Sequence, residues 1–388
     1  MLFDDAPAFP RGFRCASRNC GLKPEGKDLA LFASDVDAAA AAVFTRNQFP
    51  GAPVILGRET IKGGTLRAIV ANSKVSNVAT GAEGLANARR MAAAAAKELG
   101  TTPDHVLVSS TGVIGPRLPI EKIEAGLAGM SSDLQSDPLV GAAGIMTTDT
   151  YAKALSARIG EATITWVAKG SGMIEPNMAT MLAYIFTDAA IEPATLDHML
   201  RDAVQLSFNM LSVDSDTSTS DTCAMLANGR AGRVNERQFL DTLVAGCIRM
   251  TEMLARDGEG AEHLIRAHVT GAANGDEARR IAKSLVNSPL VKTMVHGADP
   301  NVGRLLMAVG KCFDCTIAPA STDASINGYQ VVRGGSRVDF DEAIVRDTLR
   351  REVVDLEVSL GVGTASATAF GCDLTKGYID ENAAYYSS

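Results

Sequence analysis

A glycine- and proline-containing loop leads directly into a buried-strand pattern over residues 169–188, and this junction constrains the chain more than any other feature. Two glycines and Pro176 predict a loop with tight or positive-φ geometry. Residues 180–186 form a nearly continuous apolar run, which is typical of a fully buried strand. Thr180, with the small residue Ala179 before it, therefore lies where a loop enters a core strand. A nucleophilic hydroxyl needs such a placement, but the pattern alone favours an ordinary loop-to-strand junction.

Length and charge restrict the class of protein. A chain of 388 residues suggests two or three domains. The net charge is −8 and no basic run occurs, which argues against nucleic acid or an anionic membrane surface as a partner. No apolar stretch approaches the length of a membrane span, and the N-terminus lacks the apolar region of a secretory signal. We therefore expect a cytoplasmic protein.

The cysteines and histidines do not show the spacing of a metal site. Seven cysteines, an odd number scattered along the chain, indicate reduced thiols. Cys312 and Cys315 form a single C-x-x-C motif without a second pair, so two neighbouring thiols are a simpler interpretation than a redox pair or a zinc site. The five histidines show no ligand spacing either. The sequence predicts no metal.

Short apolar runs alternate with helical patterns along the chain, which predicts a mixed α/β protein. One helix is expected over Leu85–Leu99, with a capping box at Thr80 and Glu83 and a stop at Gly100. A second begins after the N-cap residue Asn235. Dinucleotide and triphosphate loops of the G-x-G-x-x-G and G-x-x-x-x-G-K-[ST] types are missing. A change in the sequence pattern places a domain boundary near residue 281.

The polar, glycine-rich segments contain no histidine, so a Ser-His-Asp triad is not visible. If the chemistry is nucleophilic, another base must activate the hydroxyl. The α-amine of an N-terminal residue, with an ordinary pKa of about 8, is one such base. For Thr180 this would require cleavage of the peptide bond that precedes it.

A set of long motifs resembles one family, the ornithine acetyltransferases (glutamate N-acetyltransferases), from Pro10 to Tyr385. The shared motifs are Val43–Arg46, Ser110–Gly115, Ile145–Thr150, Lys169–Met173 followed by Met178-Ala-Thr180, Asp216–Thr219, Asp257–Ala261, Ser288–Thr293 and Cys372–Thr375.

The resemblance implies an αββα-type layered fold and a precursor that cuts itself between Ala179 and Thr180. The resulting α chain (residues 1–179) and β chain (residues 180–388) commonly assemble as α2β2. Within the β chain, residues 180–280 would carry the nucleophile, and residues 281–388 would form a smaller C-terminal α/β domain that contributes a substrate-binding tail. The Thr180 hydroxyl would take the acetyl group from N2-acetyl-L-ornithine and pass it to L-glutamate, with ping-pong kinetics. No cofactor is implied, and use of acetyl-CoA as a substrate is left open.

The resemblance also assigns roles to individual residues. Thr111 and Gly112 match the positions that stabilise the oxyanion. The matching substrate-binding positions are Thr147, Lys169, Thr180, Glu259, Asn382 and Ser387. Lys169 suits a carboxylate and Glu259 an ammonium group, whereas a solvated lysine and a helix-terminal acid are the structural alternatives. Ser388 is an alternative to Ser387.

The chain departs from the family pattern at several positions. Lys74 and Val75 replace a usual Gly-Asn pair, and Val302 replaces a usual Trp. Glu175 and Ser220 replace a commoner Ala and Asn, and at these two positions the chain resembles the transacetylases of secondary-metabolite gene clusters. These differences leave open the same acyl-enzyme chemistry on another donor or acceptor, or an amidase or aminopeptidase that uses water. A rival of another class is an unprocessed binding or assembly protein.

Overall fold

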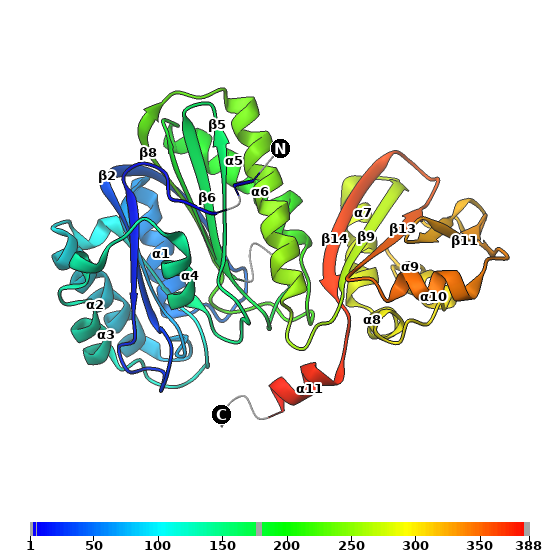
Figure 1. Ribbon diagram of the computed structural model, residues 1–388, viewed down its shortest axis with the longest axis horizontal. Coiled ribbons are helices and arrows are strands. Elements are labelled where there is room, and N and C mark those ends of the chain that lie inside the picture. Colours follow the sequence, from blue (N-terminus) through cyan, green and yellow to red (C-terminus); the bar gives the residue numbers. More distant parts are fainter. Residues whose placement is uncertain (1–2, 5, 176–180, 384–388) are drawn as a thin grey trace. The chain divides into compact units, whose positions relative to one another are not determined.

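The computed structural model describes residues 3–4, 6–175 and 181–383, which form two compact units (Figure 1). The first unit comprises Met1–Gly170, Pro176–Asn209 and Thr217–Met250, and the second comprises Ser171–Glu175, Met210–Asp216 and Thr251–Ser388. The domain boundary that the sequence predicts near residue 281 lies inside helix α7 (Gly275–Asn287) of the second unit.

The first unit contains an eight-stranded mixed sheet in the order β4-β3-β2-β8-β7-β6-β5, with β1 also paired to β2. Its strands are β1 (Phe13–Arg18), β2 (Leu29–Phe44), β3 (Thr65–Asn72), β4 (Val106–Ser110), β5 (Lys153–Ile159), β6 (Ala162–Lys169), β7 (Leu182–Ala189) and β8 (Thr222–Gly232). Its helices are α1 (Ala52–Thr60), α2 (Gly81–Leu99), α3 (Ile120–Leu127), α4 (Pro138–Ile145), α5 (Pro193–Leu206) and most of α6 (Glu236–Arg256).

Both faces of this sheet are buried, because alternate residues of its strands enter two different cores. On β2, Phe32 belongs to a core that includes Tyr184 and residues of α4, while Leu31 belongs to a second core with Met91 of α2 and Ile123 of α3. A sheet covered on both faces is a layered α/β arrangement. The expected fold class, mixed α/β with layered sheets, is confirmed.

Some helix ends agree with the sequence and others do not. Gly100 ends α2 in the left-handed region at φ 65°, and the Asn235 side chain accepts a hydrogen bond from the Gln238 amide at the start of α6, as expected. The prediction of a capping box at Thr80 is wrong. Its hydroxyl instead donates to Oδ1 of Asn77 at 2.8 Å, and Thr80 makes no side-chain cap to the helix. The backbone at Thr80, with φ −107° and ψ 2°, is also outside the extended region that is typical of an N-cap residue.

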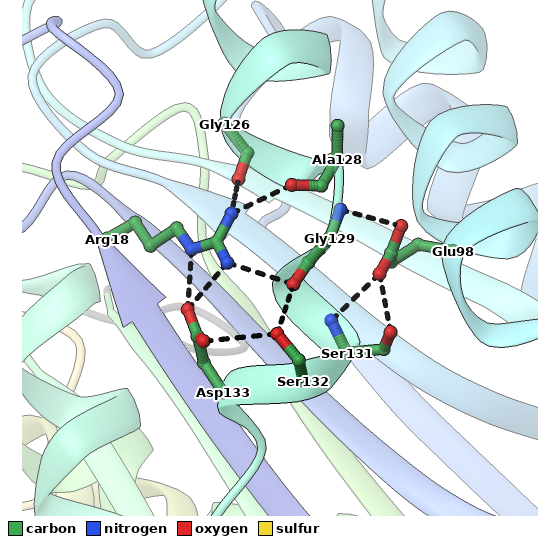
Figure 2. Close-up of polar contacts among 8 residues, drawn as sticks. All are labelled: Arg18, Glu98, Gly126, Ala128, Gly129, Ser131, Ser132 and Asp133. Carbon is green, nitrogen blue, oxygen red and sulfur yellow. Dashed lines mark hydrogen bonds and ion pairs between the residues drawn. The ribbon is translucent and has the colours of Figure 1, made fainter.

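Arg18 and Glu98 fix the helical layer beside β4 (Figure 2). The Arg18 guanidinium donates to the carbonyl oxygens of Gly126, Ala128 and Gly129, which follow or end α3 and have no partner within the helix. The Glu98 carboxylate, at the end of α2, accepts from the amides of Gly129 and Ser131. Together the two side chains join β1, α2 and the end of α3.

The second unit contains a six-stranded sheet in the order β12-β11-β10-β13-β9-β14. Its strands are β9 (Leu264–Ala272), β10 (Asp323–Ile326), β11 (Tyr329–Arg333), β12 (Ser336–Arg337), β13 (Val353–Ser359) and β14 (Ala365–Cys372). Its helices are α7, α8 (Pro289–His296), α9 (Val302–Gly310), α10 (Glu342–Leu349) and α11 (Lys376–Asn382), and α7 packs on β9 and β14. None of the helices in the described ranges has the length and apolar character needed to cross a membrane.

Candidate functional site

The segment that follows β4 is held against the loop after β3. The Thr111 amide donates to the carbonyl oxygen of Asn72 at 3.0 Å, and the Val113 amide donates to that of Lys74 at 2.9 Å. The Ser110 hydroxyl also donates to Oδ1 of Asn72 at 2.6 Å. These bonds fix the predicted oxyanion residues at the end of a buried strand.

Gly112 allows this close approach. Its φ is +122°, and a Cβ atom built on it would lie 2.3 Å from the carbonyl carbon and oxygen of Lys74. No other residue fits without moving the backbone. Lys74 is itself left-handed at φ 79°, a conformation that costs a non-glycine residue about 1–2 kcal/mol. A glycine at position 74 would adopt it without that cost.

Two hydrogen-bond donors at this segment remain available to a ligand. Within the described part of the chain, neither the Thr111 hydroxyl nor the Gly112 N–H donates a hydrogen bond. Thr111 is buried, with 6% of its surface exposed. A hydroxyl and a backbone N–H on adjacent residues can stabilise a developing oxyanion.

A second group of site residues surrounds Asp149. Its Oδ2 accepts from the Thr147 amide at 3.0 Å, and its Oδ1 accepts from the Gly170 amide at 2.7 Å. The Lys169 ammonium lies 3.5 Å from the Thr147 hydroxyl. The structure therefore brings together Thr147 and Lys169, two of the predicted substrate-binding residues, and Asp149 is the residue that joins them.

Asp149 also forms a fully buried ion pair with Lys153. Their oxygen and nitrogen atoms are 2.7 Å apart and both side chains are 0% exposed. Burial would raise the pKa of Asp149, but the positive charges of Lys153 and Lys169 hold it below its usual value. Sequence reasoning did not assign this pair, although Asp149 belongs to one of the shared motifs.

We expect Lys153→Met to destabilise the protein by about 3–5 kcal/mol, because it leaves the Asp149 carboxylate buried without its partner. Asp197 and Arg201 offer a control, since they form the same i, i+4 pair with side chains 42% and 50% exposed. Arg201→Met should change the free energy of unfolding by less than about 1 kcal/mol. Urea unfolding of both variants checks this, and equal losses would contradict it.

Lys23 adds positive charge to the same region. Its ammonium donates to the carbonyl oxygen of Met146 at 2.7 Å. Burial lowers the pKa of Lys23; the charges of Asp28 and Asp149 oppose this, while Lys169 and Lys74 reinforce it. Several lysines thus act on residues 146–149, an environment that suits a carboxylate ligand.

In the second unit, Glu259 and Asn382 are in contact. The Asn382 amide donates to Oε2 of Glu259 at 2.7 Å. Glu259 is 9% exposed, and its carboxylate lies against Gly172, where a Cβ atom would come within 2.2 Å of it. The two predicted residues form a partly enclosed acidic and amide pair, which suits a cationic amine.

The remaining positions named from the sequence lie either outside the described residues or in other parts of the fold. Ala179, Thr180, Ser387 and Ser388 lie outside the described residues. Val302 is the first residue of α9 and is buried at 8% exposure. Val75 pairs with Val113 beside the oxyanion segment.

A family model covers nearly all of the chain: the ArgJ family matches residues 14–387. The chain belongs to the ArgJ family. It is 44% identical over 385 residues to the arginine biosynthesis bifunctional protein ArgJ of Rhodococcoides fascians, covering 98% of this chain and 96% of that one. It is 41% identical over 391 residues to a glutamate N-acetyltransferase of Streptomyces clavuligerus, covering 99% and 100%.

A solved structure agrees with the assignment. The crystal structure of ArgJ from Bacillus halodurans is 36% identical, with a TM-score of 0.52 and coverage of 53% of this chain and 100% of that chain. The expected resemblance to the ornithine acetyltransferases is confirmed. The expected enzyme class, a glutamate N-acetyltransferase, is confirmed with it.

Proposed function

We propose that this ArgJ-family protein is an autoprocessed acyltransferase that moves acetyl from N2-acetyl-L-ornithine to L-glutamate through an acetyl ester of Thr180. The observation that carries the proposal is the adjacent pair of available donors, the Thr111 hydroxyl and the Gly112 N–H. Such a pair serves a reaction that builds negative charge on a carbonyl oxygen, as acyl transfer does.

Self-cleavage would come first. The Thr180 hydroxyl attacks the carbonyl carbon of Ala179, the acyl group moves from nitrogen to oxygen, and water hydrolyses the ester. This releases the Ala179 carboxylate and leaves Thr180 with a free α-amine. That amine has an ordinary pKa of about 8 and can accept the hydroxyl proton near neutral pH.

Transfer would then proceed in two acyl steps. The Thr180 oxygen attacks the acetyl carbonyl, the oxyanion is stabilised by Thr111 and Gly112, and the C–N bond breaks as the ornithine amine takes the proton. The glutamate amine attacks the resulting ester, and the hydroxyl of Thr180 is restored when N-acetylglutamate leaves. All atoms come from the protein and the two amino acids, so this chemistry needs no cofactor.

The sheet of the first unit supports cleavage without separation of the pieces. The proposed cut falls in sequence between β6 and β7, which pair with each other along their length. Residues before the cut supply strands β1 to β6, and residues after it supply β7 and β8. In the sheet, β8 and β7 lie between β2 and β6. The α and β chains would therefore share one sheet and stay together, and we propose an α2β2 assembly.

The length of a solved relative also supports two chains. The Bacillus halodurans chain is matched in full by 53% of this chain. Residues 180–388 are 209 of the 388 residues, a similar share.

The side chains suit the proposed substrates. The lysines around residues 146–149 suit a carboxylate, which both acetylornithine and glutamate carry. The contact between Glu259 and Asn382 suits the side-chain ammonium of ornithine.

Mass measurement under denaturing and native conditions tests the proposal. Under denaturing conditions, purified protein should give two chains, the second of which begins at Thr180. Under native conditions it should give a single α2β2 species. Added acetylornithine alone should place one acetyl group on the β chain and release ornithine. An uncut chain that takes no acetyl group would overturn the proposal.

The identity of the acceptor is read from the same reaction. If glutamate discharges the acetyl-enzyme much faster than water does, the enzyme is a transferase. Discharge at the same rate without glutamate would assign an amidase of the same chemistry, and faster discharge by another amino acid would assign a different acceptor. Because Lys74 and Val302 depart from the family pattern, a panel of acetylated and free amino acids is the appropriate substrate set.

A further inference from the structure

Three potential metal ligands from separate parts of the second unit converge on one point. Glu262 lies in the loop before β9, His296 is the last residue of α8, and Asp373 directly follows β14. One oxygen or nitrogen atom from each lies within 4.8 Å of the other two. The spacing of these residues along the chain could not reveal the group, because no two of them are near in sequence.

The two distances from His296 to the carboxylates fit a tetrahedral ion better than they fit hydrogen bonds. Nδ1 of His296 lies 3.4 Å from Oε2 of Glu262 and 3.5 Å from Oδ2 of Asp373. A charged N–H···O bond would be about 2.7–2.9 Å long. Ligand atoms about 2.0–2.2 Å from a tetrahedral zinc ion lie roughly 3.3–3.6 Å from one another.

The surroundings hold the buried carboxylate in place. Oδ1 of Asp373 accepts from the amides of Glu262 and His263 at 2.9 and 3.0 Å. Nδ1 of His263 lies 2.9 Å from Oδ2 of Asp373. The Asp373 side chain is 0% exposed, whereas those of His296 and Glu262 are 37% and 60% exposed. A preset inner ligand, supporting bonds around it and an open outer side are features of protein metal sites.

We propose that Glu262, His296 and Asp373 bind a divalent cation of the zinc type, with water in the remaining position. One imidazole nitrogen and two carboxylate oxygens are ligands that zinc accepts, and two carboxylates would neutralise its charge. His263 is a positioning residue that orients the Asp373 carboxylate. The ion has no step in acyl transfer.

The cation would hold in position the two segments that carry Glu259 and Asn382. Glu262 lies three residues after Glu259 in the same loop. On the other side, the Thr375 hydroxyl donates to the carbonyl oxygen of Gly260 at 2.6 Å, and Thr375 caps α11, which ends at Asn382. A cation joining Glu262 to Asp373 would fix both segments at their base. This role, unlike the binding itself, rests on the proposed function of Glu259.

Zinc binding to the chelator-treated, full-length protein tests the proposal without any measurement of activity. We expect one zinc ion per precursor chain by calorimetry and elemental analysis after dialysis. His296→Gln and Glu262→Gln should each weaken binding at least about tenfold. His198→Gln is the matched control, because Nε2 of His198 also lies 3.5 Å from a carboxylate oxygen, that of Asp202, but both side chains are exposed and no third ligand joins them in the described residues. This variant should bind zinc as the wild type does.

Two results would overturn the proposal. One is wild-type protein that retains no stoichiometric zinc, which would leave Glu262, His296 and Asp373 as an ion-paired cluster only. The other is unchanged binding in both ligand variants, which would assign the zinc to another place such as the Cys312 and Cys315 thiols. Neither result depends on self-cleavage or acetyl transfer, so failure here is distinct from failure of the proposed function.

Discussion

Thr180→Ala is expected to yield a single uncut chain that takes no acetyl group from acetylornithine. The substitution removes the only hydroxyl that the proposed chemistry uses as a nucleophile, for self-cleavage as well as for transfer. Without cleavage, the α-amine of residue 180 also stays in a peptide bond and cannot act as a base. Denaturing mass measurement of the purified variant, with and without acetylornithine, reads both losses at once.

Thr180→Ser is the matched variant, because it keeps the hydroxyl and removes only a methyl group. It should retain some cleavage and some acetyl labelling, although the less restricted serine side chain makes both slower. If the serine variant is as inert as the alanine variant, a hydroxyl nucleophile at this position is contradicted. Cleaved, labelled Thr180→Ala protein would contradict it more directly.

Local sequence patterns predicted the elements whose stabilising partners lie nearby in the chain. The Gly100 stop and the Asn235 cap are satisfied within a few residues, so they could be read from the sequence. The predicted Thr80 cap is wrong because it depends on the backbone conformation of Thr80, which is not extended. A four-residue motif does not fix that conformation.

The candidate site shows the complementary limit. Family motifs identified Thr111, Gly112, Thr147 and Lys169, but not what holds them. The pairing of Gly112 with Lys74 and the burial of the Asp149–Lys153 pair depend on where β3, β4 and β5 lie in the sheet. Contacts between distant segments follow from topology, so a motif search detects the residues but not their environment.

The convergence of Glu262, His296 and Asp373 is a further case of contacts set by topology. A search for ligand spacing along the chain predicted no metal site, because it tests residues that share one helix or loop. Here three different elements end at one point.

Gly112→Ala is expected to lower the rate of ornithine release from acetylornithine by about 100- to 1,000-fold, the usual effect of losing one oxyanion donor. The new Cβ would lie 2.3 Å from the Lys74 backbone. The chain must therefore move at this residue, and its N–H no longer points to the developing oxyanion. We expect the loss in kcat, with a smaller change in KM, because the donor acts in the transition state.

Gly115→Ala separates this effect from simple backbone strain. Gly115 also has a positive φ, +105°, but nothing lies within 4 Å of a Cβ atom built on it. Its alanine variant should lose about 1–3 kcal/mol of stability from the unfavourable conformation, while keeping most of its activity. Unfolding curves and steady-state rates for the two variants make the comparison. Equal loss of activity in both would mean that strain in the loop, and not a lost donor at Gly112, accounts for the effect. A selective loss in Gly112→Ala would tie the reaction to the Gly112 amide, which lies beside the Thr111 hydroxyl and donates to no group in the described residues.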